Sequence, residues 1–234
     1  MRTIATLILL TTLTTGQGQS RWTIGVVATP SLIKAADYNS DYSRLAPTYG
    51  LGISSNYSLN DRLFLNSGLT YKVKRDFAKD IPELKFSFDS NNNIIKDTIG
   101  YFKATTNLSF ISFPLTVNYK LTPGNTKTTL FLSIGIEANY LVKSVQIRYL
   151  TEETETTTWT NNELKAFFDG GINVGIGLLH NLTPNLTMMI KPEYSLDLVT
   201  SRYFLPSSFH SLTLNLQMQY RIKHKEITTA PNKG

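Results

Sequence analysis

The chain has 234 residues, no cysteine, 41% hydrophobic residues and a formal net charge of +6 at pH 7. Without cysteine it holds no disulfide, and no basic patch with interleaved aromatic residues indicates a nucleic-acid partner. After Thr15 no uncharged apolar run approaches the roughly 20 residues that a spanning helix needs, which excludes helical passage through a membrane.

The first predicted element is a secretory signal peptide at residues 1–18. Arg2 supplies its positive start, Thr3–Leu13 is uncharged and largely apolar, and small glycines precede the expected cleavage site. We therefore expect an exported protein with a mature domain at residues 19–222. The remaining polar tail, residues 223–234, is expected in the periplasm.

The mature domain alternates apolar and polar residues, which is the pattern of β-strands with two different faces. The alternating segments are residues 21–29, 48–59, 62–74, 110–121, 129–143, 168–179, 186–196 and 210–222. The clearest is FISFPLTVNYKL at 110–121. Its Pro114 lacks the N–H that a sheet requires, so we expect a local irregularity in the strand pairing there.

The connections between these segments alternate in length. Residues 60–61, 122–127 and 181–185 are short and contain turn-forming residues, whereas 30–47, 75–107, 144–167 and 197–209 are long and polar. Outer-membrane barrels have an even number of strands, short turns on one rim and long loops on the other. The sequence therefore predicts an all-β fold, an eight-stranded antiparallel up-and-down transmembrane β-barrel.

The polar face of the predicted strands carries both positive and negative charges. The predicted lumen charge network consists of Lys72, Lys120, Glu137, Lys143, Lys191, Glu193 and Arg221. Such groups can pair across a narrow lumen, with Glu137 or Glu193 as the expected partners of Lys120. The alternative is a soluble, lipocalin-like barrel that turns this face to water and its apolar face inward.

Aromatic residues near both ends of the apolar face decide between these alternatives. The predicted girdles consist of Trp22, Tyr57, Tyr119 and Tyr220 on the short-turn side and Tyr49, Tyr71, Phe113, Tyr140, Phe168 and Tyr194 on the long-loop side. Two aromatic belts around an apolar band are typical of membrane barrels. We therefore expect the protein in the cell outer membrane, in contact with outer-membrane lipid and lipopolysaccharide.

Two strand motifs resemble the PorT-like outer-membrane β-barrel family of Gram-negative bacteria. In that family an I-P-L-x-x-x-Y strand leads through a short turn to a G-x-x-x-x-Y-L strand. Phe113-Pro114-Leu115 with Tyr119 matches the first motif, and Gly135 with Tyr140-Leu141 matches the second. The resemblance implies the barrel and its location, and its namesake takes part in protein secretion. One departure is the polar tail after Ile222, where such barrels often end in an aromatic residue.

The function that we expect is a structural or interaction role through the extracellular loops, in secretion or envelope assembly. The alternatives are a channel for small solutes or hydrophobic compounds and, less favoured, a lipid A-modifying enzyme with His210-Ser211 near the extracellular rim. We expect no enzyme activity, cofactor or metal. Asp89–Asn93 opens like a calcium loop but continues with Ile94, where the turn needs glycine.

Overall fold

A computed structural model describes residues 21–35, 43–88, 94–122, 126–149, 154–160, 168–198 and 208–222. The predicted signal peptide, the whole C-terminal tail at residues 223–234 and the side chain of Phe168 lie outside this description. The strands are β1 (Trp22–Ala28), β2 (Ser31–Ala35), β3 (Ser43–Arg44), β4 (Ala46–Ser58), β5 (Leu63–Phe88), β6 (Ile94–Lys120), β7 (Thr128–Tyr149), β8 (Thr154–Thr160), β9 (Phe168–Asn181), β10 (Leu186–Leu198) and β11 (Ser208–Arg221). In the described residues no helix is long and apolar enough to cross a membrane.

The strands form a closed antiparallel barrel. Each wall strand pairs with its neighbour in the chain, and β1 closes the ring by pairing with both β4 and β11. β1 and β2 share one position in the wall, interrupted at Thr29-Pro30, because β2 also lies between β11 and β4. The ring therefore has eight strand positions, and the predicted fold class is confirmed.

The pairing at Pro114 is irregular, as its missing N–H predicts. The register between β5 and β6 passes from Ser67–Leu115 directly to Thr70–Ser112, so the two pairs in between are interrupted while the register itself is unchanged. The Ser67 hydroxyl donates a hydrogen bond of 3.0 Å to the Pro114 carbonyl. Pairing between β10 and β9 is interrupted in the same way at Lys191-Pro192. Each proline is thus accommodated by a gap in one ladder.

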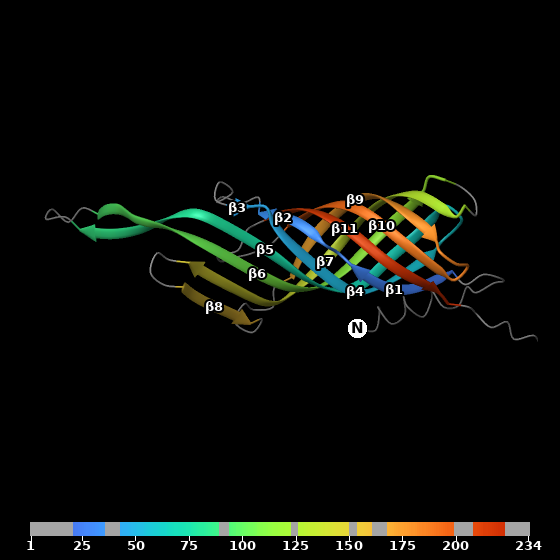
Figure 1. The fold of residues 1–234 in the computed structure, drawn as a ribbon, viewed down its shortest axis with the longest axis horizontal. Coiled ribbons are helices and arrows are strands. Elements are labelled where there is room, and N and C mark those ends of the chain that lie inside the picture. The colour runs from blue at the N-terminus through green and yellow to red at the C-terminus, as the bar shows by residue number, and fades with distance from the viewer. Residues whose placement is uncertain are drawn as a thin grey trace, which may run out of the picture.

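Three of the barrel strands continue far beyond the predicted segments. Residues 75–107, expected to be a polar loop, mostly form a hairpin paired from Arg75–Asn107 to Phe88–Ile94. In Figure 1 this hairpin projects from one end of the barrel, beside the shorter hairpin of β7 and β8. The strand pattern that the loop prediction overlooked is the alternation at Leu84, Phe86 and Phe88. Figure 1 therefore distinguishes a long-loop end, with the hairpins, from the opposite short-turn end.

A bulge interrupts the projecting hairpin just above the barrel. The register shifts between Ala78 and Ile81 of β5, and Asp80 within the bulge has a φ of 60°. This left-handed conformation is uncommon outside glycine, although Asp tolerates it better than most residues. A bulge bends and twists its strand, so the hairpin changes direction there.

Candidate functional site

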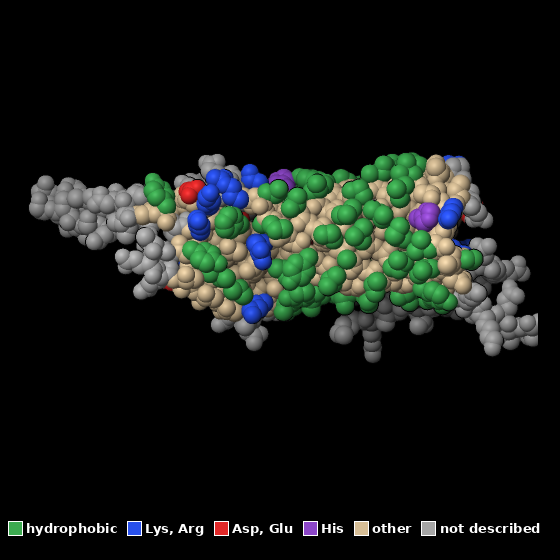
Figure 2. All heavy atoms as spheres, viewed as in Figure 1, with side chains coloured by type: hydrophobic (Ala, Val, Ile, Leu, Met, Phe, Trp, Pro, Cys, Tyr) green, Lys and Arg blue, Asp and Glu red, His purple; other side chains and the backbone are tan. Residues whose placement is uncertain are grey.

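The outer face of the barrel is an apolar band. Leu51, Ile53, Ile134 and Leu212 are each about 60% exposed, so the described residues leave these apolar side chains uncovered. Figure 2 shows hydrophobic side chains spread over the face of the barrel in view, with Lys and Arg side chains gathered toward the hairpin side. An apolar belt this extensive would be unfavourable in water, and a bilayer covers it.

Most of the predicted girdle residues lie on this outer face. Trp22, Tyr49, Tyr71, Phe113, Tyr119, Tyr194 and Tyr220 are exposed, and Tyr57 and Tyr140 are half-buried. Strand register brings Trp22 opposite Tyr57, where the ring centroids are 4.8 Å apart. Amphipathic rings favour the boundary between hydrocarbon and water, so these positions bracket the apolar band.

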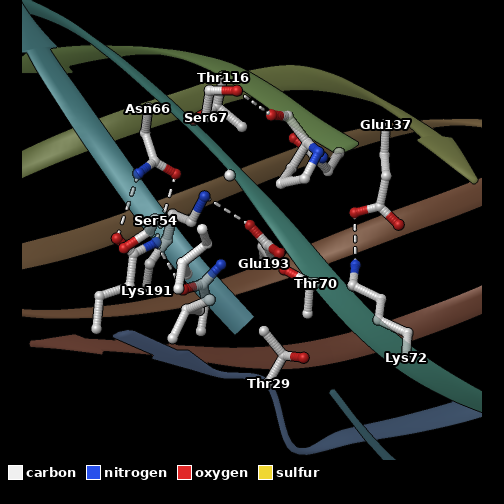
Figure 3. A pocket seen from close by; sticks show the side chains of 17 residues that line it. Thr29, Ser54, Asn66, Ser67, Thr70, Lys72, Thr116, Glu137, Lys191 and Glu193 are labelled. Atoms are coloured by element: carbon white, nitrogen blue, oxygen red, sulfur yellow. Dashed lines mark hydrogen bonds and ion pairs between the residues drawn. The ribbon is translucent and has the colours of Figure 1, made fainter. Parts of the chain in front are cut away.

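Two ion pairs lie inside the barrel. Lys72 Nζ of β5 is 2.5 Å from Glu137 Oε2 of β7, and Lys191 Nζ is 2.7 Å from Glu193 Oε2 on β10. Figure 3 shows both pairs pointing into the lumen, one joining β5 to β7 and the other on β10. The Lys191 side chain is only 1% exposed. Burial of a lone charge is costly, so each of these groups depends on its partner.

A third ionic cluster was missed by the sequence analysis. Lys74 Nζ lies 3.1 Å from Asp197 Oδ2 and 3.4 Å from Asp169 Oδ2, and 4.5 Å above the ring centroid of Phe110. The signal was present, because Lys74 lies two residues after Lys72 and therefore on the same face of β5.

Three residues of the predicted network lie apart from the buried ion pairs. Lys143 is exposed because β7 has an extra residue, Val142, at a register shift between Ser109 and Phe110 of β6. The shift reverses the alternation, so the buried Ser144 takes the inward position.

Lys120 and Arg221 are instead at the short-turn rim. They are the last residues of β6 and β11, and Arg221 is exposed. The charged groups that act on Lys120 are Asp61 and Arg221, and not the expected Glu137 or Glu193. Lys120 is half-buried at the mouth of the lumen, with its Nζ 6.0 Å from the ring centroid of Phe64. The exposed Arg221 directs its long side chain past the rim to water, which the alternation pattern does not reveal.

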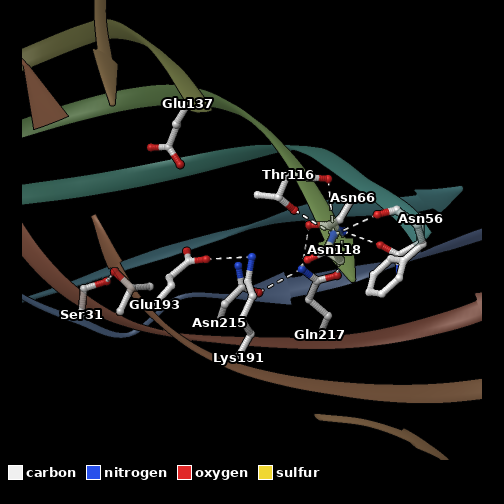
Figure 4. Close-up of polar contacts among 12 residues, drawn as sticks. Ser31, Asn56, Asn66, Thr116, Asn118, Glu137, Lys191, Glu193, Asn215 and Gln217 are labelled. Atoms are coloured by element: carbon white, nitrogen blue, oxygen red, sulfur yellow. Dashed lines mark hydrogen bonds and ion pairs between the residues drawn. The ribbon is translucent and has the colours of Figure 1, made fainter. Parts of the chain in front are cut away.

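Buried amides form a ladder in the part of the lumen near the short turns. The Gln217 amide of β11 donates a hydrogen bond of 3.0 Å to the Asn215 side chain. The Gln219 amide donates one of 2.5 Å to the Gln217 side chain. Asn66 of β5 donates to Asn56 at 2.6 Å and to Gln217 at 3.2 Å. Figure 4 shows these side chains converging from β4, β5 and β11. The ladder joins strands across the barrel and fills the lumen with hydrogen-bonded groups.

Two apolar clusters lie above and below the charged groups. The first cluster, near the short turns, consists of Phe64, Phe131 and Met189, with the Phe64 and Phe131 ring centroids 5.3 Å apart. The second, near the hairpins, consists of Ile33, Ala46, Leu108, Phe110, Leu141 and Phe209. Along β7 the order is Phe131, Glu137, Leu141, so an ion pair lies between the clusters. We name these the lower plug and the upper plug.

The lumen leaves little free volume. One cavity of about 10 Å³ is lined by residues including Lys72, Glu137 and Lys191, and another of about 20 Å³ is lined by residues including Lys74 and Asp197. Volumes of this size hold about one water molecule each. The interior is therefore packed with side chains, as expected for eight strands.

The projecting sheet carries exposed aromatic residues beyond the apolar band. Tyr101 of β6 is 66% exposed, and Tyr149 of β7 is 45% exposed. Strand register places Tyr149 opposite Lys103, two residues from Tyr101, so the three share one face of the sheet. We call Tyr101, Lys103 and Tyr149 the tyrosine face.

His210, the candidate catalytic residue, lies on the outer surface. It is exposed, and its Nδ1 forms a hydrogen bond with the Tyr194 hydroxyl of β10. In the described residues no group of three or more His, Asp or Glu side chains is arranged to hold a metal ion. The structure describes neither residues 89–93 of the calcium-like segment nor His224.

Comparison with known proteins finds one family. A family model described as "Outer membrane protein beta-barrel domain" matches residues 17–200. No curated protein matches.

Solved membrane barrels are similar at low identity. Neisserial surface protein A has 13% identity and a TM-score of 0.41, with 88% of this chain and 100% of that one covered. Ail of Yersinia pestis has 12% identity and a TM-score of 0.39, covering 87% and 100%. OprG of Pseudomonas aeruginosa has 11% identity and a TM-score of 0.40, covering 88% and 95%.

Proposed function

The chain belongs to the outer membrane β-barrel domain family, and from that premise we propose that it is a structural or interaction protein of the cell envelope. Its location is the outer membrane. In this proposal the barrel is the anchor, and the sheet formed by β5–β8 beyond the barrel is the working surface. The observation that carries the proposal is the tyrosine face, which lies outside the apolar band.

The exposure of two tyrosines on the projecting sheet requires a physical explanation. Within the band, aromatic side chains are stabilised by the lipid interface, but Tyr101 and Tyr149 belong to the projecting strands. Tyrosine and other large aromatic residues are enriched in protein interfaces because they bury much area and retain a polar group. Lys103 between them adds a positive charge. We infer a protein partner with an acidic or polar surface.

The packed lumen supports this proposal over a channel. The upper plug lies near the hairpins, the lower plug and the amide ladder lie near the short turns, and the ion pairs lie between the two plugs. A solute would have to displace buried charged side chains that are held in ion pairs, which is unfavourable. The outward position of His210, bonded to Tyr194, likewise supports a non-catalytic role.

The assignment to a subgroup of the family, and to a cellular process, is also a proposal. We propose that the chain is a PorT-like member of its family and that its partner works in protein secretion or envelope assembly. The support is the pair of motifs around Pro114 and Tyr140, which lie in neighbouring strands, β6 and β7. The register opposes Phe113 to Ala138 and Pro114 to Glu137. The two motifs therefore form one continuous patch of the wall.

A photo-crosslinking experiment in cells tests the interaction role. p-Benzoylphenylalanine is introduced at Tyr101, and crosslinked partners are identified by mass spectrometry. We expect one envelope protein to crosslink, and the variant Tyr149→Ala to reduce that crosslink several-fold because it removes a neighbouring contact.

The matched control places the same photo-reactive residue at Arg148. This residue is exposed and adjacent to Tyr149 but lies on the opposite face of the strand. The proposal is contradicted if the crosslink forms equally well from both faces or does not respond to Tyr149→Ala. Mobility of the unheated protein in detergent gels verifies that each variant retains the folded barrel.

A further inference from the structure

A pair of basic side chains lies on the outer surface of the barrel where the apolar band ends. Lys34 of β2 and His210 of β11 are directly opposite each other in the antiparallel register, and both are exposed. Directly opposed residues on one face have Cβ atoms about 5 Å apart. The two side chains can therefore reach a single small ligand from neighbouring strands.

Tyr194 orients the imidazole of this pair. Its hydroxyl is hydrogen-bonded to His210 Nδ1, and the two rings are 5.9 Å apart between centroids. When the hydroxyl donates to Nδ1, the proton of the neutral imidazole is on Nε2. Nε2 is then a hydrogen-bond donor that remains available on the outer surface.

The level of the pair matches the boundary between hydrocarbon and lipid head groups. The neighbouring pair toward the middle of the barrel is Leu32–Leu212, both exposed in the apolar band. Tyr194, beside them, is one of the girdle aromatics. Figure 2 shows a histidine together with Lys and Arg side chains at this edge of the band. The site thus has hydrocarbon on one side and water on the other.

No carboxylate of the described residues neutralises this pair. Lys34 has no ion pair or hydrogen bond within the described part of the chain, and the pairing of β2 with β4 ends at Ile33–Ala46, one residue before it. The nearest acidic residue on β10, Asp197, points inward and binds Lys74 at 3.1 Å.

The long-loop side of the described barrel also carries more exposed basic than acidic side chains. The exposed basic residues on the described long-loop side are Lys34, Arg44, Lys79, Lys103, Lys143 and Arg148, and the exposed acidic ones are Asp80 and Glu155. This end of the described barrel therefore carries a net positive charge, which favours an anionic ligand.

We propose that Lys34 Nζ and His210 Nε2 bind a phosphate group of a lipid in the outer leaflet, with Tyr194 as a positioning residue. The apolar residues below the pair contact the acyl chains of the same lipid, which distinguishes the ligand from free phosphate. This inference goes beyond the interaction role, because it concerns the membrane-facing surface and not the tyrosine face. The ligand chemistry is a phosphate monoester or diester carried on a membrane lipid.

The test measures lipid retained by the folded protein, by native mass spectrometry from detergent. Three probes are used: lipid A with its phosphates, dephosphorylated lipid A, and phosphatidylglycerol. We expect tighter binding of phosphorylated than of dephosphorylated lipid A. Lys34→Ala with His210→Ala should weaken that binding about tenfold, as expected for the loss of charge-assisted hydrogen bonds. Binding of dephosphorylated lipid A should not change.

Matched variants separate a site from a general charge effect. Lys127→Ala removes an equal charge from the exposed short-turn rim, at the other end of the barrel, and should leave lipid A binding unchanged. Lys34→Arg in the His210-containing chain should retain binding, and Tyr194→Phe should weaken it only partly. Equal binding of phosphatidylglycerol and lipid A would identify any lipid phosphate as the ligand. Equal binding of lipid A to the wild type and the double variant would overturn the proposal.

Discussion

The barrel wall and the projecting sheet are built from the same strands but have opposite requirements. Within the wall, β5 and β6 alternate between an exposed apolar face, such as Leu115, and a fully buried polar face, such as Ser112 and Asn118. Beyond the rim the same β6 carries exposed Tyr101 and Lys103. In the wall, each position is fixed by lipid outside and by packing inside. In the sheet beyond the barrel, neither lipid nor lumen packing constrains the exposed side chains of Tyr101 and Lys103.

This difference predicts where substitutions destabilise the protein and where they affect only binding. Changes inside the lumen should have large effects on the free energy of unfolding. Changes on the tyrosine face should leave it nearly unchanged. The following variants test that contrast, by urea unfolding in lipid vesicles for stability.

The largest effect is expected for Lys191→Met. The variant leaves Glu193, 6% exposed, without its ion-pair partner at 2.7 Å. An uncompensated buried charge costs about 3–5 kcal/mol. The double variant Lys191→Met with Glu193→Leu should recover most of that loss. Failure of the second substitution to recover stability would argue that the pair is not the reason for the loss.

Phe131→Ala should be next, at about 3 kcal/mol, because it leaves a cavity in a packed cluster. Phe131 is 0% exposed and packs edge-to-face on Phe64 in the lower plug. Phe131→Leu is the control that retains most of the volume and should cost less. A loss below 1 kcal/mol for the alanine variant would contradict tight packing at this end of the lumen.

Gly177→Ala should destabilise by about 1–3 kcal/mol through overpacking. A Cβ at Gly177 would lie 2.3 Å from Cζ of Phe131, whose ring is already enclosed by the plug. Combining Gly177→Ala with Phe131→Leu should cost less than the sum of the two single variants. Strict additivity would show that the two positions are not in contact.

Tyr101→Ala should change the free energy of unfolding by less than about 0.5 kcal/mol, as surface substitutions usually do. Its effect should appear instead in partner binding. Tyr71→Ala is a useful comparison, since Tyr71 is also an exposed tyrosine of a long strand but belongs to the girdle. A similar loss of stability for both variants would remove the distinction between the wall and the sheet.

Much of the barrel could be predicted because strand alternation reports two faces directly. The alternation gave the eight wall segments and put Lys72, Glu137, Lys191 and Glu193 on the face that lines the lumen. It was misleading for Lys143, because a bulge reverses the two faces and nothing in the local sequence marks the extra residue Val142. Rim residues such as Arg221 were also misassigned, since alternation carries no information about strand ends.

The plugs were missed for a different reason. Phe64, Phe131 and Phe209 lie near the strand ends on the polar face of their strands. The alternation pattern predicts polar side chains at these positions, so it does not indicate an apolar cluster there. An aromatic residue on a lumen-facing position is therefore a useful signal of closure in a narrow barrel. The polar composition of residues 75–107 favours a loop, and the strand that forms there is indicated only by the alternation in residues 84–88.

The central claim is that the lumen is closed and that the protein acts through its surface. Single-channel recording in planar bilayers tests it most directly, with the wild type and Phe131→Ala measured side by side. Our account predicts no large stepwise conductance for either protein, because the charged middle and the upper plug remain when the lower plug is opened. Uniform conductance steps in the wild type that increase in Phe131→Ala would contradict it and favour a solute channel.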